Sequence, residues 1–269
     1  MTNTKKKNGN KRKLLGAVGM LTVSAAMLVS STFAWFSLNK NVTATSMSVT
    51  AKSSSVYLLI GDEDANTAEL VQQDNLTEKA GKAASITQIY PSAYKNNETL
   101  SYTTKMAKSS DFADPTKWYR ATAASAGAST AKANTLSALT STYFNQYVIH
   151  YQYHLTLAVG SEQASNLKVT AYTPTMTNVK AGDNETMQAV KVVVCGPDGY
   201  TELATTDTTG KADVLANTVS DSAVTTIDVY VYYDGNDPTV YTNNIANLEG
   251  ANFTIEFGVT AASDEPLAS

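Results

Sequence analysis

The chain has 269 residues, of which 43% are hydrophobic and 16% are charged, and its formal net charge is −4. The charged fraction lies below the roughly 25% of an average globular protein, so neutral polar residues must cover much of the surface. This composition excludes a disordered polyelectrolyte and argues against a basic protein that binds nucleic acid. A single Cys excludes an internal disulfide, and two His residues leave little material for metal or acid–base chemistry.

The N-terminus has the three parts of a secretory signal peptide. Six basic residues lie within the first 13 positions, and residues 14–29 that follow carry no charge. Thr32 and Ala34 then place small side chains at positions −3 and −1 of a cut before Trp35. An uncleaved membrane anchor stays open as the alternative, because the uncharged residues 14–36 are long enough to span a hydrocarbon core of about 30 Å.

Removal of residues 1–34 changes the charge balance of the chain. The six basic residues of the leader would leave 14 of the 20, against all 24 acidic residues, for a net charge of −10. We therefore expect a secreted protein, extracellular or on the cell surface, with no affinity for nucleic acid.

Short segments that alternate apolar with polar or β-branched residues recur along the rest of the chain. Because successive side chains of a strand point to opposite faces, this pattern predicts antiparallel strands with one face packed and the other in water. The alternating segments are 47–51, 148–159, 167–172, 227–232 and 253–259. Residues 56–60 form a short apolar run, and the β-branched run 190–194 leads through a turn at 196–199 into 200–204, the second arm of a predicted hairpin. Strands in this number, without intervening helices, favour an all-β fold, namely an antiparallel β-sandwich of jelly-roll-like form, with residues 47–269 as a single domain.

Residues 61–147 lack most of this alternation and are predicted to form an insertion of loops and short helices. Apolar residues between positions 136 and 147 recur at helical spacing. A second short helix is predicted near residues 75–84. The apolar content of the insertion is too thin for the core of a separate domain.

The residues that most often carry chemistry do not form a recognisable motif. His150 and His154 lie on an alternating segment, where four residues span about 13 Å, too far for one metal ion. Cys195 ends an apolar strand, where a buried inert thiol is expected. We therefore expect a protein that is not an enzyme and holds no cofactor.

A calcium loop is weakly suggested by Asp62, Asp64 and Asn66, which offer oxygen atoms at alternate positions. Thr67 stands where such a loop needs Gly, and Gln73 stands where it needs a bidentate Glu, so a polar turn is favoured.

Three tyrosines, Tyr230, Tyr232 and Tyr233, stand close together near the end of one predicted strand. Cross-strand packing is the expected role of tyrosines on strands. If one face of the sheet is open, the same residues form an exposed aromatic patch suited to a carbohydrate.

The start of the chain resembles that of the TasA/camelysin family. The resemblance rests on Thr32-Phe33-Ala34-Trp35-Phe36-Ser37, followed by Val42-Thr43-Ala44 and Met47-Ser48-Val49, and covers about residues 11–60. It implies an exported protein of a Gram-positive bacterium, cut by a dedicated signal peptidase of the SipW type. It further implies a jelly-roll-like sandwich that builds the fibres of a biofilm matrix. Camelysins have been described as metalloproteases, but this chain lacks a His-Glu-x-x-His motif.

In that family an N-terminal strand of one subunit completes the sheet of the next. By resemblance the donor strand lies in residues 35–46, with Trp35, Phe36, Leu38 and Val42 as its apolar anchors. The partners implied are further copies of the chain joined head to tail, the signal peptidase, and other matrix or cell-surface components. The segment could instead pack on its own sheet or remain an unstructured stub.

Two further functions stay open at this point. One is a membrane-anchored surface adhesin or carbohydrate-binding module. The other is a secreted peptidase, which the missing metal motif disfavours.

Overall fold

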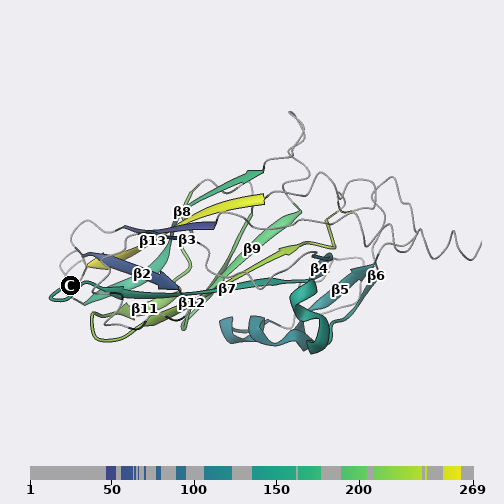
Figure 1. The fold of residues 1–269 in the computed structure, drawn as a ribbon, viewed down its shortest axis with the longest axis horizontal. Coiled ribbons are helices and arrows are strands. Elements are labelled where there is room, and N and C mark those ends of the chain that lie inside the picture. The colour runs from purple at the N-terminus through teal and green to yellow at the C-terminus, as the bar shows by residue number, and fades with distance from the viewer. Residues whose placement is uncertain are drawn as a thin grey trace, which may run out of the picture.

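The computed structural model shows an all-β sandwich, as the sequence predicts (Figure 1). Thirteen strands and three short 3₁₀ helices lie within the described part of the chain. The structure describes residues 47–52, 56–62, 64, 66, 70, 77–79, 89–94, 106–122, 135–161, 163–176, 189–204, 207, 209–237, 240 and 251–261.

The first sheet brings the two ends of the described chain together. Its strands, in spatial order, are β11 (Ala216–Val219), β8 (Ala164–Met176), β13 (Ala251–Ala261), β1 (Met47–Lys52) and β3 (Thr77–Lys79). All neighbours are antiparallel except β1 and β13, which run parallel. The antiparallel sandwich expected from the sequence is confirmed, with this one parallel pair inside it.

The second sheet contains the predicted hairpin at one of its edges. Its strands, in spatial order, are β10 (Tyr200–Leu203), β9 (Val190–Cys195), β12 (Thr225–Tyr233), β7 (Ile149–Leu157) and β2 (Leu58–Asp62). All neighbours are antiparallel. The turn between β9 and β10 is closed by the N–H of Gly196, which donates to the carbonyl oxygen of Gly199 at 2.8 Å.

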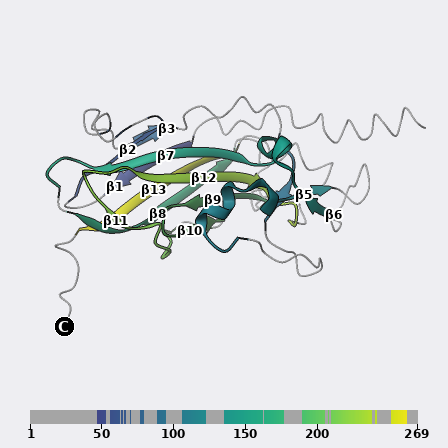
Figure 2. The ribbon, with the colours of Figure 1, turned by 90° about the horizontal axis from the view of Figure 1, so that it is seen from below.

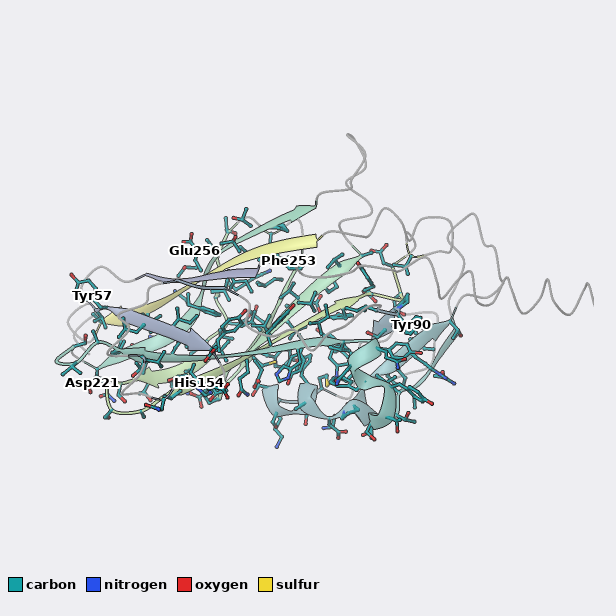
Figure 3. All side chains as sticks on the ribbon, in the orientation of Figure 1. Tyr57, Tyr90, His154, Asp221, Phe253 and Glu256 are labelled. Atoms are coloured by element: carbon teal, nitrogen blue, oxygen red, sulfur yellow. The ribbon has the colours of Figure 1, made fainter. Side chains whose placement is uncertain are left out.

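The main core lies between these two sheets and follows the predicted alternation. On β12 the inward residues are Ile227, Val229 and Val231, all 5% exposed or less. From the first sheet, Phe253 of β13 (labelled in Figure 3) stacks on Tyr172 of β8, with ring centroids 6.0 Å apart. Each such side chain contributes about 1.5–3 kcal/mol when fully buried.

The insertion is richer in strands than the sequence predicts. It forms a third sheet from β4 (Ser92–Ala93), β5 (Tyr119–Thr122) and β6 (Thr135–Ala138), together with η1 (Ser109–Ala113), η2 (Pro115–Lys117) and η3 (Ser141–Gln146). The third sheet lies at one end of the sandwich, and the coiled ribbons lie beside the second sheet (Figures 1 and 2).

Two helix predictions in the insertion are corrected. Strand β3 lies where a helix was expected near residues 75–84, and Leu136 belongs to strand β6. The helix expected between residues 136 and 147 is present only as the short 3₁₀ helix η3, which includes Tyr143 and Phe144 but not Leu139 or Tyr147. Pairing with β1 and with β5 supplies hydrogen bonds that outweigh a weak local helical preference.

A cluster of mostly aromatic side chains packs the insertion against the outer face of the second sheet. Its members are Tyr94, Met106, Phe112, Trp118, Leu139, Val148, Val193, Cys195, Tyr230 and Tyr232. Trp118 is fully buried, and its Nε1–H donates to the carbonyl oxygen of Phe112 at 3.0 Å. The insertion thus has enough apolar surface to cover a face that alternation alone assigns to water.

This cover overturns the hypothesis of an exposed tyrosine patch. Tyr230 and Tyr232 are 2% and 3% exposed beneath the insertion. Tyr233 points the other way, into the core between the two large sheets. The three residues stand on opposite faces because side chains alternate along β12.

Candidate functional site

The N-terminal strand β1 is held in the first sheet by residues distant in the sequence. It pairs with β13 from Met47 opposite Phe253 to Lys52 opposite Gly258. On its other side it pairs with β3 at only three positions. Without β1, the side of β13 from Phe253 to Gly258 would lose its partner, and alternate residues there would present unpaired N–H and C=O groups, the surface on which an added strand assembles.

Both neighbours of β1 in the sheet, β13 and β3, are strands that do not follow it directly along the chain. The next strand along the chain, β2, belongs to the second sheet, so β1 forms no hairpin with its sequence neighbour. Its place is therefore set by long-range pairing with the last described strand and not by a turn.

Several residues predicted to act at the N-terminus lie outside the described residues. These are Thr32, Ala34, Trp35, Phe36, Leu38 and Val42, all of which precede β1. Among the residues that are described, no helix has both the length and the apolar composition needed to cross a membrane.

A polar cluster lies on the outer face of the second sheet, beside the insertion. The Nε2 atom of His150 on β7 lies 2.8 Å from Oδ1 of Asp228 on β12. The side-chain amide of Gln152 donates to the same oxygen at 2.9 Å. The His150 ring also stacks on Tyr230, with ring centroids 4.6 Å apart and planes 10° apart.

Asp228 is an ionised carboxylate at neutral pH. Its partial burial acts to raise the pKa, but hydrogen bonds from His150 and Gln152 and the nearby histidines outweigh burial and lower the pKa below its usual value. The Asp228 side chain is 29% exposed, so water and small solutes reach it.

Cys195 faces Asp228 from the neighbouring strand β9, with their Cα atoms in register. Burial raises the pKa of the Cys195 thiol far above its usual value, and the negative charge of Asp228 acts in the same direction. The thiol is therefore neutral and only 2% exposed, the inert buried Cys expected from the sequence.

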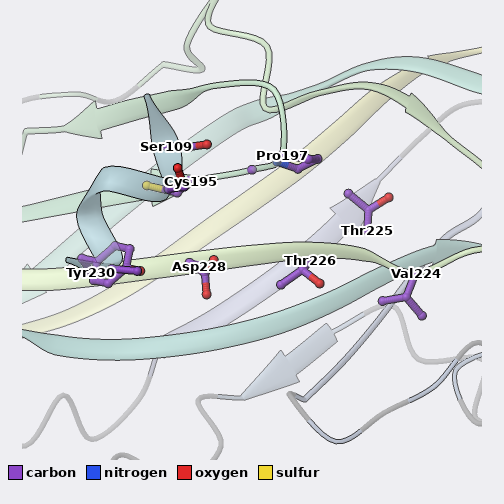
Figure 4. Close-up of a pocket in the computed structure, with 11 residues that line it drawn as sticks. Ser109, Cys195, Pro197, Val224, Thr225, Thr226, Asp228 and Tyr230 are labelled. Carbon is purple, nitrogen blue, oxygen red and sulfur yellow. The ribbon is translucent and has the colours of Figure 1, made fainter. Parts of the chain in front are cut away.

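A groove of about 450 Å³ opens above Asp228, between helix η1 and strand β12 (Figure 4). Ser109 and Ser110 of η1 form one wall, and Cys195 and Pro197 lie at the end of β9. Thr226 and Asp228 stand on the same face of β12, two residues apart. The groove thus combines one carboxylate with hydroxyl groups and short apolar side chains.

The two histidines do not converge on a metal. Both lie on β7, where the strand prediction placed them, and His154 is opposite Thr226 in the register. Within the described residues, no group of three or more His, Cys, Asp or Glu is arranged to hold a metal ion.

The weak calcium candidates lie in a turn. Asp62 is the last residue of β2, and its Oδ1 accepts a hydrogen bond from the backbone N–H of Asp64 at 3.2 Å. The carbonyl oxygen of Asn66 accepts from the N–H of Leu70 at 3.0 Å. These bonds are typical of an Asx turn followed by a local backbone turn.

The comparisons with known proteins found nothing: no family model, no curated protein and no solved structure matches this chain. Its function is therefore inferred from its own residues and geometry.

Sequence reasoning missed the groove because its walls are far apart along the chain. The available signal was the presence of His150, Gln152 and Asp228 at outward positions of two strands. That pattern equally describes a water-exposed sheet face, and only the packing of η1 turns it into a groove.

Proposed function

We propose that this protein is a secreted structural protein that polymerises head to tail by β-strand donation into an extracellular fibre. The observation that carries the proposal is the parallel pairing of β1 with β13. In an otherwise antiparallel sandwich, this pair places the N-terminal described strand inside the first sheet without a hairpin to its sequence neighbour β2.

The donated strand would come from residues 35–46, immediately before β1. A cut after Ala34 would leave Trp35 at the new N-terminus of this segment. Twelve residues extend over at most about 40 Å, which is sufficient to reach a neighbouring subunit. Trp35, Phe36 and Leu38 supply apolar anchors, and the backbone of the segment pairs with an open sheet edge of the next subunit.

This mode of contact can repeat from subunit to subunit to build an open filament. The donor is at the N-terminus and the acceptor is a sheet edge, so each contact joins two different surfaces. Such a heterologous contact repeats without closing unless the rotation between subunits happens to close a ring. A fibre of this kind suits an extracellular biofilm matrix, with other matrix or cell-surface components as further partners.

The first test is the identity of the exported N-terminus. Mass spectrometry and N-terminal sequencing of the exported protein should give a chain that begins Trp35-Phe36-Ser37. A chain that retains Met1 would instead favour a membrane-anchored surface protein and contradict release by cleavage.

The second test is filament formation by the mature chain, followed by electron microscopy. We expect filaments from residues 35–269 and none after deletion of residues 35–46. Deletion of residues 262–269 is the matched control, because it also removes a terminal segment and should leave filaments intact. Filaments that persist without residues 35–46 would contradict strand donation.

Point variants distinguish a loss of the apolar anchor side chains from a simple shortening of the N-terminal segment. Trp35→Ser with Phe36→Ser should abolish filaments, because the apolar anchors are lost. Asn39→Ser with Lys40→Ser changes the same segment at residues expected to face water, and filaments should persist. Equal loss in both double variants would contradict the assignment of anchors.

A further inference from the structure

The groove above Asp228 has no role in strand donation, since it lies on the outer face of the second sheet. Its floor holds Asp228 and Tyr230 of β12, and helix η1 forms one side (Figure 4). A volume of about 450 Å³ lies within the roughly 300–1,000 Å³ range of small-molecule sites.

The negative charge of Asp228 favours a cationic ligand in the groove. Within the described residues, the basic side chain that contacts Asp228 is His150, which reaches Oδ1 and forms an ion pair only when its ring is protonated. Gln152 donates to the same oxygen, and no described Lys or Arg pairs with this carboxylate. A partly buried carboxylate gains more from a cation than a fully hydrated one, because the surrounding dielectric constant is lower.

The remaining lining fits an ammonium group on a hydrocarbon stem. An ammonium group has three donors and no acceptor. Asp228 and the hydroxyl oxygens of Ser109 and Thr226 supply acceptors around the groove. Ala113, Pro197 and Val224 offer apolar surface, against which an aliphatic stem packs while its charged end reaches the carboxylate.

The same lining does not suit a sugar that stacks on an aromatic ring. Tyr230 is the aromatic residue of the groove, and it is only 2% exposed. The ring of His150 lies flat against it. Sugar recognition by stacking needs an open aromatic face, which this tyrosine does not offer.

We propose that this groove binds a primary ammonium group carried on an aliphatic stem. The ammonium donates to the Asp228 carboxylate and to the hydroxyl groups of Ser109 and Thr226, and the stem packs against Pro197 and Val224. Two sources share this chemistry, namely the side chain of a lysine in another protein and a free alkyl diamine.

Titration calorimetry of the mature chain at neutral pH tests the proposal with defined probes. We expect Nα-acetyl-lysine amide and 1,5-diaminopentane to bind, and the Nε-acetylated form of the lysine probe to bind at least tenfold more weakly. Tighter binding of the lysine probe identifies a protein side chain as the source, and tighter binding of the diamine identifies a small molecule. Equal binding of the acetylated probe, or no binding of either amine, overturns the proposal.

Variants then locate the binding in the groove. Asp228→Asn should weaken amine binding at least tenfold, because the amide keeps an acceptor for His150 and Gln152 but has no charge. Asp62→Asn is the matched control at the exposed end of β2 and should bind as the wild type does. Unchanged binding by Asp228→Asn overturns the proposal.

A second variant keeps the carboxylate and fills the space. Thr226→Arg places a guanidinium two residues from Asp228 on the same strand face, within about 7 Å along the strand. We expect it to abolish amine binding while the thermal midpoint stays close to that of the wild type. If Asp228→Asn fails to fold, this variant decides the outcome, and retained amine binding overturns the proposal. Displacement of the amine by glucose would also overturn it in favour of a sugar site.

Discussion

Replacement of Asp234 by Asn should stabilise the protein at neutral pH and not in acid. Asp234 directly follows β12. Its backbone N–H donates to the carbonyl oxygen of Ala189 at 2.7 Å, and its Oδ1 accepts a hydrogen bond from the backbone N–H of Asn236 at 3.0 Å. Burial raises the pKa of the Asp234 carboxyl to about 6, against the opposing effect of the Asn236 hydrogen bond. The negative charge of Glu202 also acts to raise this pKa.

The size and sign of the effect follow from proton linkage. In the unfolded chain this carboxyl ionises near its usual pKa of 3.8, whereas the native protein holds the proton up to about pH 6. Between these values the native state binds more protons, so the free energy of unfolding falls as the pH rises. The full difference corresponds to about 3 kcal/mol. Because Asp234 is partly exposed as a whole residue, we expect about 1–3 kcal/mol after solvent screening.

Urea denaturation of the wild type and Asp234→Asn at about pH 4 and about pH 7 measures this difference. The Asn variant keeps the acceptor for Asn236, so the two proteins should match at the lower pH, and the variant should be more stable at the higher pH. An equal stability difference at both pH values would refute the reasoning.

Asp111→Asn provides a control of opposite sign. A hydrogen bond from Lys117, together with the backbone N–H of Ala107, holds the pKa of Asp111 at about 2. The stability from this carboxylate is present above the unfolded value of 3.8 and is lost as the pH falls toward 2. The variant should therefore be less stable than the wild type at neutral pH, and the difference should shrink in acid.

Three further predictions concern the buried face beneath the insertion. Trp118→Ala should cost about 3–5 kcal/mol of unfolding free energy. Trp118→Phe should cost about 1–3 kcal/mol, because the carbonyl of Phe112 loses its donor; a denaturation midpoint equal to the wild type would contradict this packing. Gly235→Ala should destabilise the protein, because the added Cβ would overlap the Cβ of Ala121. Adding Ala121→Gly should recover part of the lost stability. A double-mutant cycle that shows no recovery would contradict this steric account. In the native protein, Cys195 should resist thiol reagents at neutral pH until denaturant is added. Mass spectrometry of the labelled protein measures this reaction, and rapid labelling without denaturant would contradict the burial of Cys195.

The sequence predicts the long strands well because their signal is local. Alternation along 148–159, 227–232 and 253–259 corresponds to β7, β12 and β13, since a pleated strand needs no other part of the chain to set its period. The turn residues at 196–199 likewise specify the hairpin of β9 and β10. The interior position of Cys195 follows from its apolar neighbours.

Tertiary structure decides which strands pair with one another and which segments cover the faces of the sheets. Nothing local to β1 specifies a parallel neighbour two hundred residues away, because backbone hydrogen bonding accepts either direction. The alternation of side chains along β12 assigns Tyr230 and Tyr232 to the outer face of the second sheet. It does not predict that Trp118 covers them. The groove at Asp228 exists for the same reason: its carboxylate, its hydroxyl groups and η1 meet only once the insertion packs on the sheet.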